Sequence, residues 1–367
     1  MRVLQVTGFL PPHYGGVESY VTGLSKQLVA MGVEVDVATS EGHGGDGVRT
    51  ITCPSAVNVL GNPVMRGLKR VMVEGRYDIV HLHTPPQIPA LQASRVCTAL
   101  RVPYVITYHC DGEVSHPALK PVIPAFMGTM GNRILDGAAR IIATTSEYAS
   151  TSPYLKDREY SVIPVGVDTS RFSDGADGNE VRRSLNLDGR FVVGFVGRLV
   201  GHKGVDTLLD AITSLPKDEI GCLVVGDGPR RQVLMREADE RGIEGAVFTG
   251  HVDDAQLSAH YVAMDVLVLP SRSREEAFGL TILEGIASGI PVVISNIPGP
   301  SEIADEGYAL TFDRDDVEGL RGCLVSLKDD IGLRNRMGAT ARAVAMERFC
   351  WTKVAPRILS LYEEVVA

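Results

Sequence analysis

The stretch Glu276-Ala-Phe-Gly-Leu-Thr-Ile-Leu-Glu284 joins a loop rich in Ser, Arg and Glu to a segment of helical character. Phe278-Gly279 marks the change from loop to helix, and the apolar run Ile290–Ser295 predicts a buried strand. A helix that begins after such a loop presents free N–H groups and the positive end of its dipole, which suit a diphosphate. We therefore expect Glu276 to contact the group that the phosphate carries. Glu284, about a turn and a half into the helix, is placed to accept hydrogen bonds from a ribose.

Two glutamates of this kind, taken alone, are better explained as a surface loop residue and a solvated helix residue than as a ligand site. The length and composition of the chain indicate the number of domains and the class of protein to which these glutamates belong. The 367 residues are enough for two domains, each with its own core. With 44% hydrophobic and 22% charged residues, the composition is typical of a soluble globular protein.

The net charge of −9 is unevenly distributed. Residues 1–170 carry 14 basic and 14 acidic side chains, which leaves 22 basic and 31 acidic ones for the rest of the chain. A nucleic-acid partner would require a basic face, so this distribution argues against one.

Three features predict a cytoplasmic protein. The opening Met1–Val6 is too short, and too soon followed by Gly8 and Pro11, to be a signal peptide. No apolar run approaches the roughly 18–20 residues that cross a bilayer. The six cysteines form no Cys-x-x-Cys pair, and buried free thiols in a reducing compartment explain them best.

Short apolar runs alternate with helical lengths along the chain, and the pattern pauses only at the polar stretch Val165–Asp188, where we place a linker. The strands expected before it are Leu4–Val6, Val33–Thr39, Ile79–Leu82, Tyr104–Thr107, Ile141–Thr144 and Ser161–Pro164. Those expected after it are Phe191–Val196, Leu223–Val225, Val247–Thr249, Val266–Leu269, Val292–Ile294 and Ala309–Phe312. This alternation predicts an α/β protein with two doubly wound, mostly parallel sheets. Such sheets bind ligands beyond the carboxyl ends of their strands.

Polar residues follow several of these strands. The loop Gly197-Arg198 to Lys203-Gly204 carries two cations, which could stabilise negative charge on a leaving phosphate or simply be solvated. Gly15-Gly16, in the loop Pro-Pro-His-Tyr-Gly-Gly, allows close approach of a ligand to a helix start, or makes a tight turn. Asp227, in Gly226-Asp-Gly-Pro229, belongs to a phosphate-binding turn or caps the next helix.

Histidines also stand at strand ends. His109 follows the strand at Tyr104–Thr107 and could bond a sugar hydroxyl, help to pass a proton, or be a satisfied core histidine. His81 and His83 alternate on another strand, and we interpret both as structural or peripheral.

Taken together, these motifs resemble the family 4 group of retaining glycosyltransferases, which have two Rossmann-like domains facing across a cleft (GT-B). The segments that carry the resemblance are Glu276–Glu284, Gly15-Gly16-Val-Glu, Tyr108-His109, Pro164–Asp168 before Phe172, Gly197-Arg198, His202-Lys203-Gly204, Gly226–Pro229 and Gly250–Val252. They span nearly the whole chain and are specific for the class, but not for the substrate.

The resemblance implies roles for individual residues. The catalytic residues would be His109, Arg198, Lys203 and Glu276. Substrate would be bound by Gly15, Gly16, Gly197, Asp227, Val252, Phe278, Gly279, Leu280 and Glu284. It also implies front-face attack, in which the departing phosphate takes the acceptor's proton and Glu276 orients sugar hydroxyls rather than forming a covalent bond.

The domains expected from the resemblance are an acceptor-binding domain, 1–170, and a nucleotide-sugar-binding domain, 171–350. A C-terminal helix, 351–367, would cross back to the first domain. The Asp-x-Asp pattern at Asp313-Arg-Asp315 is used as a metal site by some transferases, but its place before a helix favours capping. Arg198 and Lys203 can replace a divalent cation, so we predict no metal and no cofactor beyond the sugar nucleotide.

The expected reaction is transfer of mannose from GDP-mannose to a glycan, glycolipid or other hydroxyl acceptor, with UDP-glucose or another UDP-hexose as the alternative donor. Two other functions fit the same architecture: a sugar-nucleotide epimerase, which would lack the Arg198, Lys203, Glu276 and Glu284 set, and a scaffold that binds without turnover.

The segment Pro63–Gly75 predicts an amphipathic helix with a stripe of Met65, Leu68, Val71 and Met72. Its cations are Arg66, Lys69 and Arg70, with Arg76 just beyond. Such a helix either lies on an anionic membrane at the cytoplasmic face or covers its own sheet.

Overall fold

The computed structural model describes residues 1–13, 15–45, 47–59, 61–111, 127–172, 176–304 and 307–367. The chain divides into two compact units. Unit 1 comprises Met1–Gly166 together with Trp351–Ala367, and unit 2 comprises Val167–Cys350. The division after Gly166 lies four residues before the boundary expected at 170, and the chain returns to unit 1 at Trp351.

Unit 1 is built on a seven-stranded sheet in which every strand pair is parallel. In sheet order, its strands are β3 (Arg49–Thr52), β2 (Glu34–Thr39), β1 (Arg2–Val6), β6 (Ile79–Thr84), β7 (Tyr104–Tyr108), β8 (Arg140–Ala143) and β9 (Ser161–Val162). A separate antiparallel hairpin is formed by β4 (Ser55–Val59) and β5 (Asn62–Met65). The sequence patterns did not predict β3, β4 or β5, because these strands are short and only partly buried.

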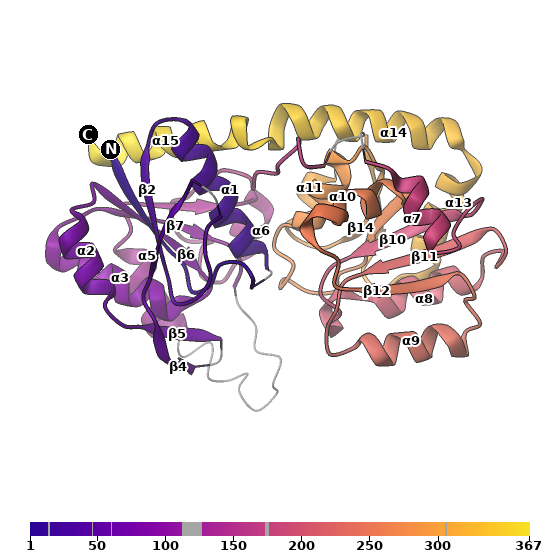
Figure 1. Ribbon diagram of the computed structural model, residues 1–367, viewed down its shortest axis with the longest axis horizontal. Coiled ribbons are helices and arrows are strands. Elements are labelled where there is room, and N and C mark those ends of the chain that lie inside the picture. Colours follow the sequence, from indigo (N-terminus) through magenta and orange to yellow (C-terminus); the bar gives the residue numbers. More distant parts are fainter. Residues whose placement is uncertain (14, 46, 60, 112–126, 173–175, 305–306) are drawn as a thin grey trace. The chain divides into compact units, whose positions relative to one another are not determined.

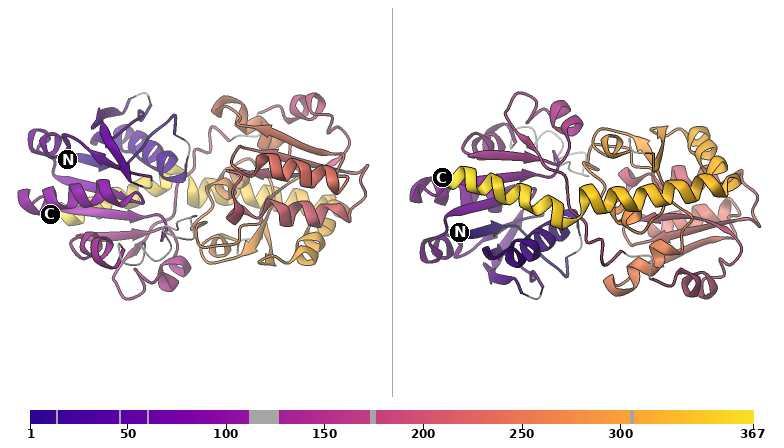
Figure 2. Two further views of the ribbon diagram at one scale, coloured as in Figure 1. Left: turned by 90° about the horizontal axis from the view of Figure 1, so that it is seen from below. Right: turned by 90° about the horizontal axis from the view of Figure 1, so that it is seen from above.

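The helices of unit 1 cover this sheet (Figures 1 and 2). In the described residues they are α1 (Gly16–Ala30), α2 (Leu68–Gly75), α3 (Gln87–Leu100), α5 (Asn132–Asp136), α6 (Ser146–Thr151) and α15 (Trp351–Val366), with a π-helical turn, η2, at Met127–Gly131. α1 packs beside α15, and α2 packs beside α3.

The C-terminal helix α15 is part of the core of unit 1. Its apolar face, which includes Trp351, Ile358 and Tyr362, is buried. The Trp351 ring lies edge-on to Tyr20 of α1 at 5.4 Å between centroids. A β-carbon at Gly23 would approach the Trp351 indole nitrogen to 2.3 Å, so only glycine leaves room for this ring on α1.

Unit 2 contains a six-stranded parallel sheet. In sheet order, its strands are β12 (Ala246–Gly250), β11 (Ile220–Val225), β10 (Phe191–Val196), β13 (Val266–Leu269), β14 (Val292–Asn296) and β15 (Ala309–Asp313). Counted along unit 2, this is the order 3-2-1-4-5-6 of nucleotide-binding α/β folds. β10 and β13 coincide with the strands expected from the sequence, since both are continuous apolar runs.

The helices of unit 2 lie on both faces of its sheet (Figure 1). They are α7 (Gly178–Ser184), α8 (Val205–Thr213), α9 (Arg231–Glu240), α10 (Asp254–Val262), α11 (Leu280–Ala287), α12 (Pro300–Ile303), α13 (Val317–Asp329) and α14 (Ile331–Val344). Two short turns complete the set, the 3₁₀ turn η3 (Gly201–Lys203) and the π-helical turn η4 (Ala345–Phe349).

Two local expectations need correction. The expected linker Val165–Asp188 contains α7, which packs on α10; Asp177 caps it through the N–H groups of Asn179 and Glu180. Residues 173–175 of that stretch lie outside the described part of the chain. The expected helix Pro63–Gly75 is instead the end of β5 followed by α2, because Gly67 adopts a positive φ of 82° between them.

The cysteines also differ from expectation. All six are free, but only Cys53, Cys97 and Cys222 are buried. The other three are partly exposed.

Candidate active site

The cations predicted to bind phosphate lie in the loop after β10. Arg198 is exposed, and its side chain makes no hydrogen bond or ion pair with any residue in the described ranges. Its neighbour Leu199 is fully buried and anchors the loop. Arg198 is therefore held at the carboxyl edge of the sheet with its guanidinium available to a ligand.

The Gly226–Pro229 turn supports this loop from β11. The Leu199 N–H donates to the Asp227 carbonyl at 2.8 Å, and the Arg230 N–H donates to the Leu199 carbonyl at 3.1 Å. Gly226 has a φ of 128°, and a β-carbon there would meet the Gly197 carbonyl oxygen at 2.1 Å. The glycine is thus needed for close packing of two loops.

Asp227 does not cap a helix. α9 begins at Arg231, and its N-cap residue is Arg230. The exposed Asp227 carboxylate instead accepts from the neighbouring Gly228 N–H at 2.7 Å. The alternative interpretation of Asp227 as a helix cap is wrong, because the turn continues for three more residues before the helix starts.

Lys203 and Glu276 come together although they are 73 residues apart. The Lys203 ammonium forms an ion pair with the Glu276 carboxylate, and the buried Ser271 hydroxyl donates to the same oxygen at 3.1 Å. Glu276 is itself only 8% exposed. The two residues expected to act on the sugar diphosphate are therefore neighbours on adjoining loops after β10 and β13.

The start of α11 depends on glycine. Gly279 has a φ of 84°, and a β-carbon there would approach Ile282 to 2.7 Å and Leu269 to 2.9 Å. Phe278 is buried and lies edge-on to Phe349. α11 consequently begins at Leu280; the Ile282 N–H donates to the Gly279 carbonyl at 2.9 Å, and the first N–H groups of a helix have no carbonyl four residues earlier within it.

Glu284 lies in the second turn of α11 and has specific partners. The buried Tyr261 hydroxyl donates to its carboxylate at 2.6 Å. Burial raises the pKa of Glu284, while the Tyr261 hydrogen bond and the positive charge of Arg171 oppose that rise. Arg171 also pairs with Asp254 at 2.9 Å. Glu284 is thus a carboxylate held in place by the Tyr261 hydrogen bond rather than a solvated helix residue.

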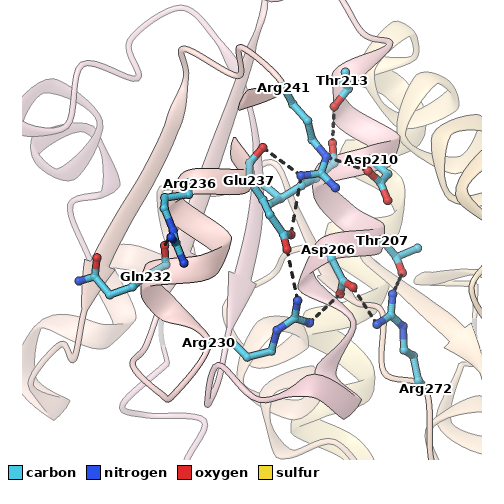
Figure 3. A network of polar contacts seen from close by, with 11 residues as sticks. Asp206, Thr207, Asp210, Thr213, Arg230, Gln232, Arg236, Glu237, Arg241 and Arg272 are labelled. Carbon is cyan, nitrogen blue, oxygen red and sulfur yellow. Dashed lines mark hydrogen bonds and ion pairs between the residues drawn. The ribbon is translucent and has the colours of Figure 1, made fainter. Parts of the chain in front are cut away.

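A polar network joins the loops that carry Lys203 and Glu276 (Figure 3). Arg272 donates to the Asp206 carboxylate at 2.9 Å and to the Thr207 hydroxyl at 2.7 Å. Its backbone N–H donates to the His202 carbonyl at 2.7 Å. Arg230 reaches Asp206 from the other side at 3.4 Å. Arg272 therefore ties the loop after β13 to the start of α8.

The Asp313-Arg-Asp315 segment contributes to this network instead of capping. Asp315 pairs with Arg272, and the cap of α13 is the next residue, Asp316, whose carboxylate accepts from the Gly319 N–H at 3.0 Å. Within the described ranges, no three His, Cys, Asp or Glu side chains gather in a way that could hold a metal ion.

In unit 1, His109 lies just after β7, and its N–H donates to the Thr84 carbonyl at 2.8 Å. The His109 ring is 3.2 Å from the ring nitrogen of His83, and the Tyr20 ring stands edge-on to it at 4.9 Å. Burial lowers the pKa of His109 to about 3. His109 is thus a neutral imidazole at physiological pH.

Gly15 and Gly16 lie at the start of α1, and Tyr14 of their motif falls outside the described residues. Gly15 is the N-cap residue, in an extended conformation that any residue can adopt. The carboxylate of Glu18 lies close by, because a β-carbon on Gly15 would come within 2.4 Å of it. An anion bound at this helix start would have to displace Glu18.

Val252 follows β12 and is partly buried after Gly250, whose φ is 72°.

Four residues that contact the predicted site residues or hold their loops were not predicted from the sequence: His83, Tyr261, Ser271 and Arg272. Of these four, only His83 was named from the sequence, and its interpretation as structural or peripheral is corrected by its contact with His109. Nothing in the sequence indicated which carboxylate Tyr261 or Arg272 would contact.

Two family models match the chain in succession. Glycosyltransferase Family 4 matches residues 14–171, and Glycosyl transferases group 1 matches residues 177–344. A Mycobacterium tuberculosis protein, GDP-mannose-dependent alpha-(1-6)-phosphatidylinositol monomannoside mannosyltransferase, is 29% identical over 382 aligned positions that cover 97% of each chain. The O-antigen chain mannosyltransferase C of Escherichia coli is 28% identical and covers 99% of this chain and 98% of its own.

Among solved structures, Anabaena HepE in complex with UDP and glucose superposes with a TM-score of 0.82 at 20% identity, covering 99% of both chains. A sucrose-phosphate synthase from Thermosynechococcus elongatus superposes with a TM-score of 0.79 at 22% identity, covering 100% of this chain and 99% of that one. These likenesses establish the fold. With the two family models and the mannosyltransferase relatives, they show that this chain is a family 4 glycosyltransferase of the GT-B type, a hexosyltransferase similar to mannosyltransferases.

Proposed function

We propose that this enzyme transfers mannose from GDP-mannose to a hydroxyl acceptor with retention of the anomeric configuration. The observation that carries the proposal is the Lys203–Glu276 pair beside the exposed Arg198 in unit 2, because it places two cations and a carboxylate at one edge of the sheet. The choice of donor follows the relatives, of which those from Mycobacterium tuberculosis and Mycolicibacterium smegmatis are named as GDP-mannose-dependent. A UDP-hexose is the alternative donor, favoured by the UDP bound in the Anabaena structure.

In the proposed reaction, the bond between the anomeric carbon and the diphosphate breaks, and negative charge builds up on the departing phosphate. Arg198 and Lys203 stabilise that charge without any proton transfer. The acceptor oxygen approaches the same face of the sugar, and its proton passes to the departing phosphate. Glu276, fixed by Lys203 and Ser271, orients sugar hydroxyls, and His109 binds a hydroxyl as a neutral hydrogen-bond partner.

The donor would lie along unit 2. The first-turn N–H groups of α11, from Leu280 onward, suit the diphosphate, and Gly279 allows close approach. Glu284, oriented by Tyr261, accepts hydrogen bonds from the ribose. Gly197, Asp227 and Val252 follow neighbouring strands and would complete the donor contacts in unit 2, while Gly15 and Gly16 would contact substrate in unit 1. We propose that no divalent cation takes part, because Arg198 and Lys203 supply the positive charge.

We further propose that the acceptor is attached to a lipid and that unit 1 contacts the cytoplasmic face of an anionic membrane through α2. Arg66, Lys69 and Arg76 are exposed there, while Leu68 and Met72 are buried in unit 1. The apolar stripe therefore serves the core, and the contact would be electrostatic. No helix in the described part of the chain is both long and apolar enough to span a bilayer.

The donor is tested by thermal denaturation with GDP, GDP-mannose, UDP and UDP-glucose. A ligand at about 100 times its dissociation constant adds roughly 2.7 kcal/mol of stability. We expect GDP and GDP-mannose to stabilise the protein and the uridine nucleotides to leave it unchanged. Stabilisation by UDP and UDP-glucose alone would replace the proposed donor with the alternative.

The reaction itself is tested by following the anomeric proton of the product by NMR with a polyprenyl- or inositol-linked mannoside as acceptor. Retention requires an α-linked product from the α-linked donor. An isomerised sugar nucleotide formed without acceptor would identify an epimerase, and donor binding with no turnover on any acceptor would identify a scaffold.

Membrane contact is tested by co-sedimentation with anionic vesicles at low and high salt. Replacing Arg66, Lys69 and Arg70 together by Ser should weaken binding, since each cation near an anionic surface contributes about 1 kcal/mol. A matched variant removes three exposed cations elsewhere in unit 1, Lys26, Arg95 and Lys156, and should bind like the wild type. Equal loss in both variants, or no binding by the wild type, would refute a specific contact through α2.

A further inference from the structure

Four buried or partly buried polar side chains form a continuous chain inside unit 1. The Gln5 amide nitrogen on β1 donates to the Ser25 hydroxyl on α1 at 2.8 Å. The Gln5 amide oxygen is 2.9 Å from Nε2 of His83 on β6. Nδ1 of His83 is in turn 3.2 Å from Nε2 of His109. Gln5, Ser25 and His83 are all fully buried, so none can exchange these partners for water.

This arrangement determines where each ring carries its proton. An amide oxygen only accepts, so Nε2 of His83 must carry the hydrogen that it donates to Gln5. Because burial keeps His83 neutral by lowering its pKa, its Nδ1 has a lone pair and accepts. His109, also neutral, must therefore donate to His83 from Nε2. The remaining ring nitrogen of His109, Nδ1, is left as an acceptor, and no residue in the described ranges hydrogen-bonds to it.

We propose that His83 and Gln5 are positioning residues that hold His109 in its Nε2–H tautomer, so that its Nδ1 accepts a hydrogen bond from a substrate hydroxyl. The proposal rests on the proposed role of His109 in sugar binding and adds the atom that it uses and the residues that set it. A ring with an acceptor facing the substrate favours a hydroxyl and disfavours an anionic oxygen at this point, since the latter offers no hydrogen.

A second set of contacts keeps the rings in place. Nδ1 of His81 is 2.5 Å from the Tyr362 hydroxyl of α15, and Nε2 of His81 is 2.7 Å from the Thr107 hydroxyl. Burial keeps the pKa of Tyr362 well above its ordinary value, so its hydroxyl stays protonated. The His81 and His83 rings lie 4.3 Å apart, and Tyr20 lies edge-on to both His83 and His109. The C-terminal helix thus helps to fix the orientation of the histidines.

The tautomers can be read directly from long-range ¹⁵N–¹H correlation spectra of the full chain labelled at histidine, assigned through His83→Gln and His109→Gln variants. We expect both His83 and His109 to be neutral Nε2–H tautomers at pH 7. Two outcomes would overturn the proposal. One is that both rings are Nδ1–H tautomers, which would follow if the oxygen and nitrogen of the Gln5 amide were exchanged. The other is a charged His109. This measurement needs no activity and no variant other than those used for assignment.

The effect on catalysis is tested with two replacements at His83. His83→Asn retains a hydrogen-bond acceptor near the place of Nδ1, whereas His83→Phe keeps a ring but removes the acceptor. With the proposed donor and acceptor as substrates, we expect kcat to fall about tenfold in His83→Phe and to be largely restored in His83→Asn, while KM for the donor changes little. Partly exposed His260 on α10 provides the control, and His260→Phe should match the wild type.

The outcomes separate the two hypotheses. Correct tautomers with full activity in His109→Gln would remove His109 from the reaction while leaving the hydrogen-bond chain as described. Equal activity in His83→Phe and His83→Asn, combined with loss in His109→Gln, would refute the positioning role of His83 and leave the role of His109 intact. If His83→Phe does not fold, the wild-type spectrum still decides the tautomer.

Discussion

The two sheets of this protein have the same order in their first six strands, but the carboxyl ends of those strands carry different chemistry. In unit 1, His81 and His83 are buried on a strand and His109 is partly buried just after one, and all three are hydrogen-bonded to neutral partners. In unit 2, the corresponding edge carries charged side chains on loops, paired as Lys203 with Glu276 and as Arg272 with Asp206.

The difference follows from what each environment can hold. A fully buried titratable group takes its neutral form, so a strand interior can present histidine as an uncharged hydrogen-bond partner. A charge needs an opposite charge or water, which loops at a sheet edge provide. We infer that unit 1 is suited to hydrogen bonding with substrate hydroxyls and that unit 2 is suited to stabilising phosphate charge. The two units should therefore respond to different perturbations.

The largest expected effect is the loss of unit 1 stability in acid. Burial lowers the pKa of His81 and His109 to about 3, below the 6.5 of an unfolded histidine. Between these values the unfolded chain binds more protons, so the stability is complete above pH 6.5 and falls as the pH drops toward 3. Each histidine contributes a slope of up to about 1.4 kcal/mol per pH unit.

The measurement uses the single tryptophan, Trp351, which lies in the core of unit 1 and reports its unfolding by fluorescence. We expect the urea midpoint to fall markedly between pH 7 and pH 5. His260→Gln, at a partly exposed position outside unit 1, should leave this dependence unchanged. A midpoint that is constant over this range would show that the buried histidines do not differ in pKa from the unfolded chain.

The next effect is in unit 2, where Arg198→Ala or Lys203→Ala should each reduce kcat on the order of 100-fold or more. The physical reason is the loss of a fixed charge that acts mainly on the transition state, comparable to the loss of one oxyanion donor. Arg236→Ala, which removes an exposed cation from α9, serves as the matched control and should remain fully active. Wild-type turnover in Lys203→Ala would place the Lys203–Glu276 pair outside the reacting site.

A smaller loss of kcat is expected from Arg272→Ala, because Arg272 acts by holding the loop after β13 against the start of α8. We expect kcat to fall about tenfold, equivalent to one hydrogen bond. Arg272→Lys keeps the charge but cannot reach Asp206, Thr207 and Asp315 together, so its activity should be intermediate. Arg321→Ala, which breaks only an exposed ion pair on α13, should have no effect, and a loss equal to that of Arg272→Ala would count against a specific role for the network.

Arg272 also bears on acid stability. Burial would raise the pKa of Asp206, but the hydrogen bond and charge of Arg272, together with Arg230, lower it overall. The stability that Asp206 contributes is therefore present above its unfolded pKa and is lost as the pH falls below that value. Arg272→Ala should reduce this contribution, whereas the histidine-dependent loss in unit 1 begins at a higher pH and should be unchanged.

The smallest expected effect is that of chelation. Activity should be the same with and without EDTA, since cationic side chains in unit 2 supply the positive charge that a metal would provide. A strict requirement for magnesium or manganese would contradict this and would direct attention to the acidic residues at the end of β15. The assay is the same donor-turnover measurement, with added magnesium as the reciprocal test.

Much of the fold follows from hydrophobic pattern. β10 and β13 are continuous apolar runs, and burial on both faces of a parallel sheet requires nothing else. The pattern does not predict a strand whose residues are mostly polar, as in β3. It also fails where residues that form one apolar stripe in the sequence belong to two different elements. In Pro63–Gly75, Met65 and Met72 are both buried, but the first belongs to a strand and the second to a helix.

The sequence by itself determined the class of the protein, the two doubly wound sheets and the strand ends where Arg198, Glu276 and His109 stand. These depend on local periodicity and on motifs that lie close together along the chain. Only the tertiary structure decided that Lys203 contacts Glu276, that Arg272 joins two loops, and that Gln5 and Tyr362 reach the histidines. Such contacts link residues 65 to 281 positions apart. They are fixed by the register of parallel strands and by the packing of α15, and neither feature can be predicted from residues that are close together in the sequence.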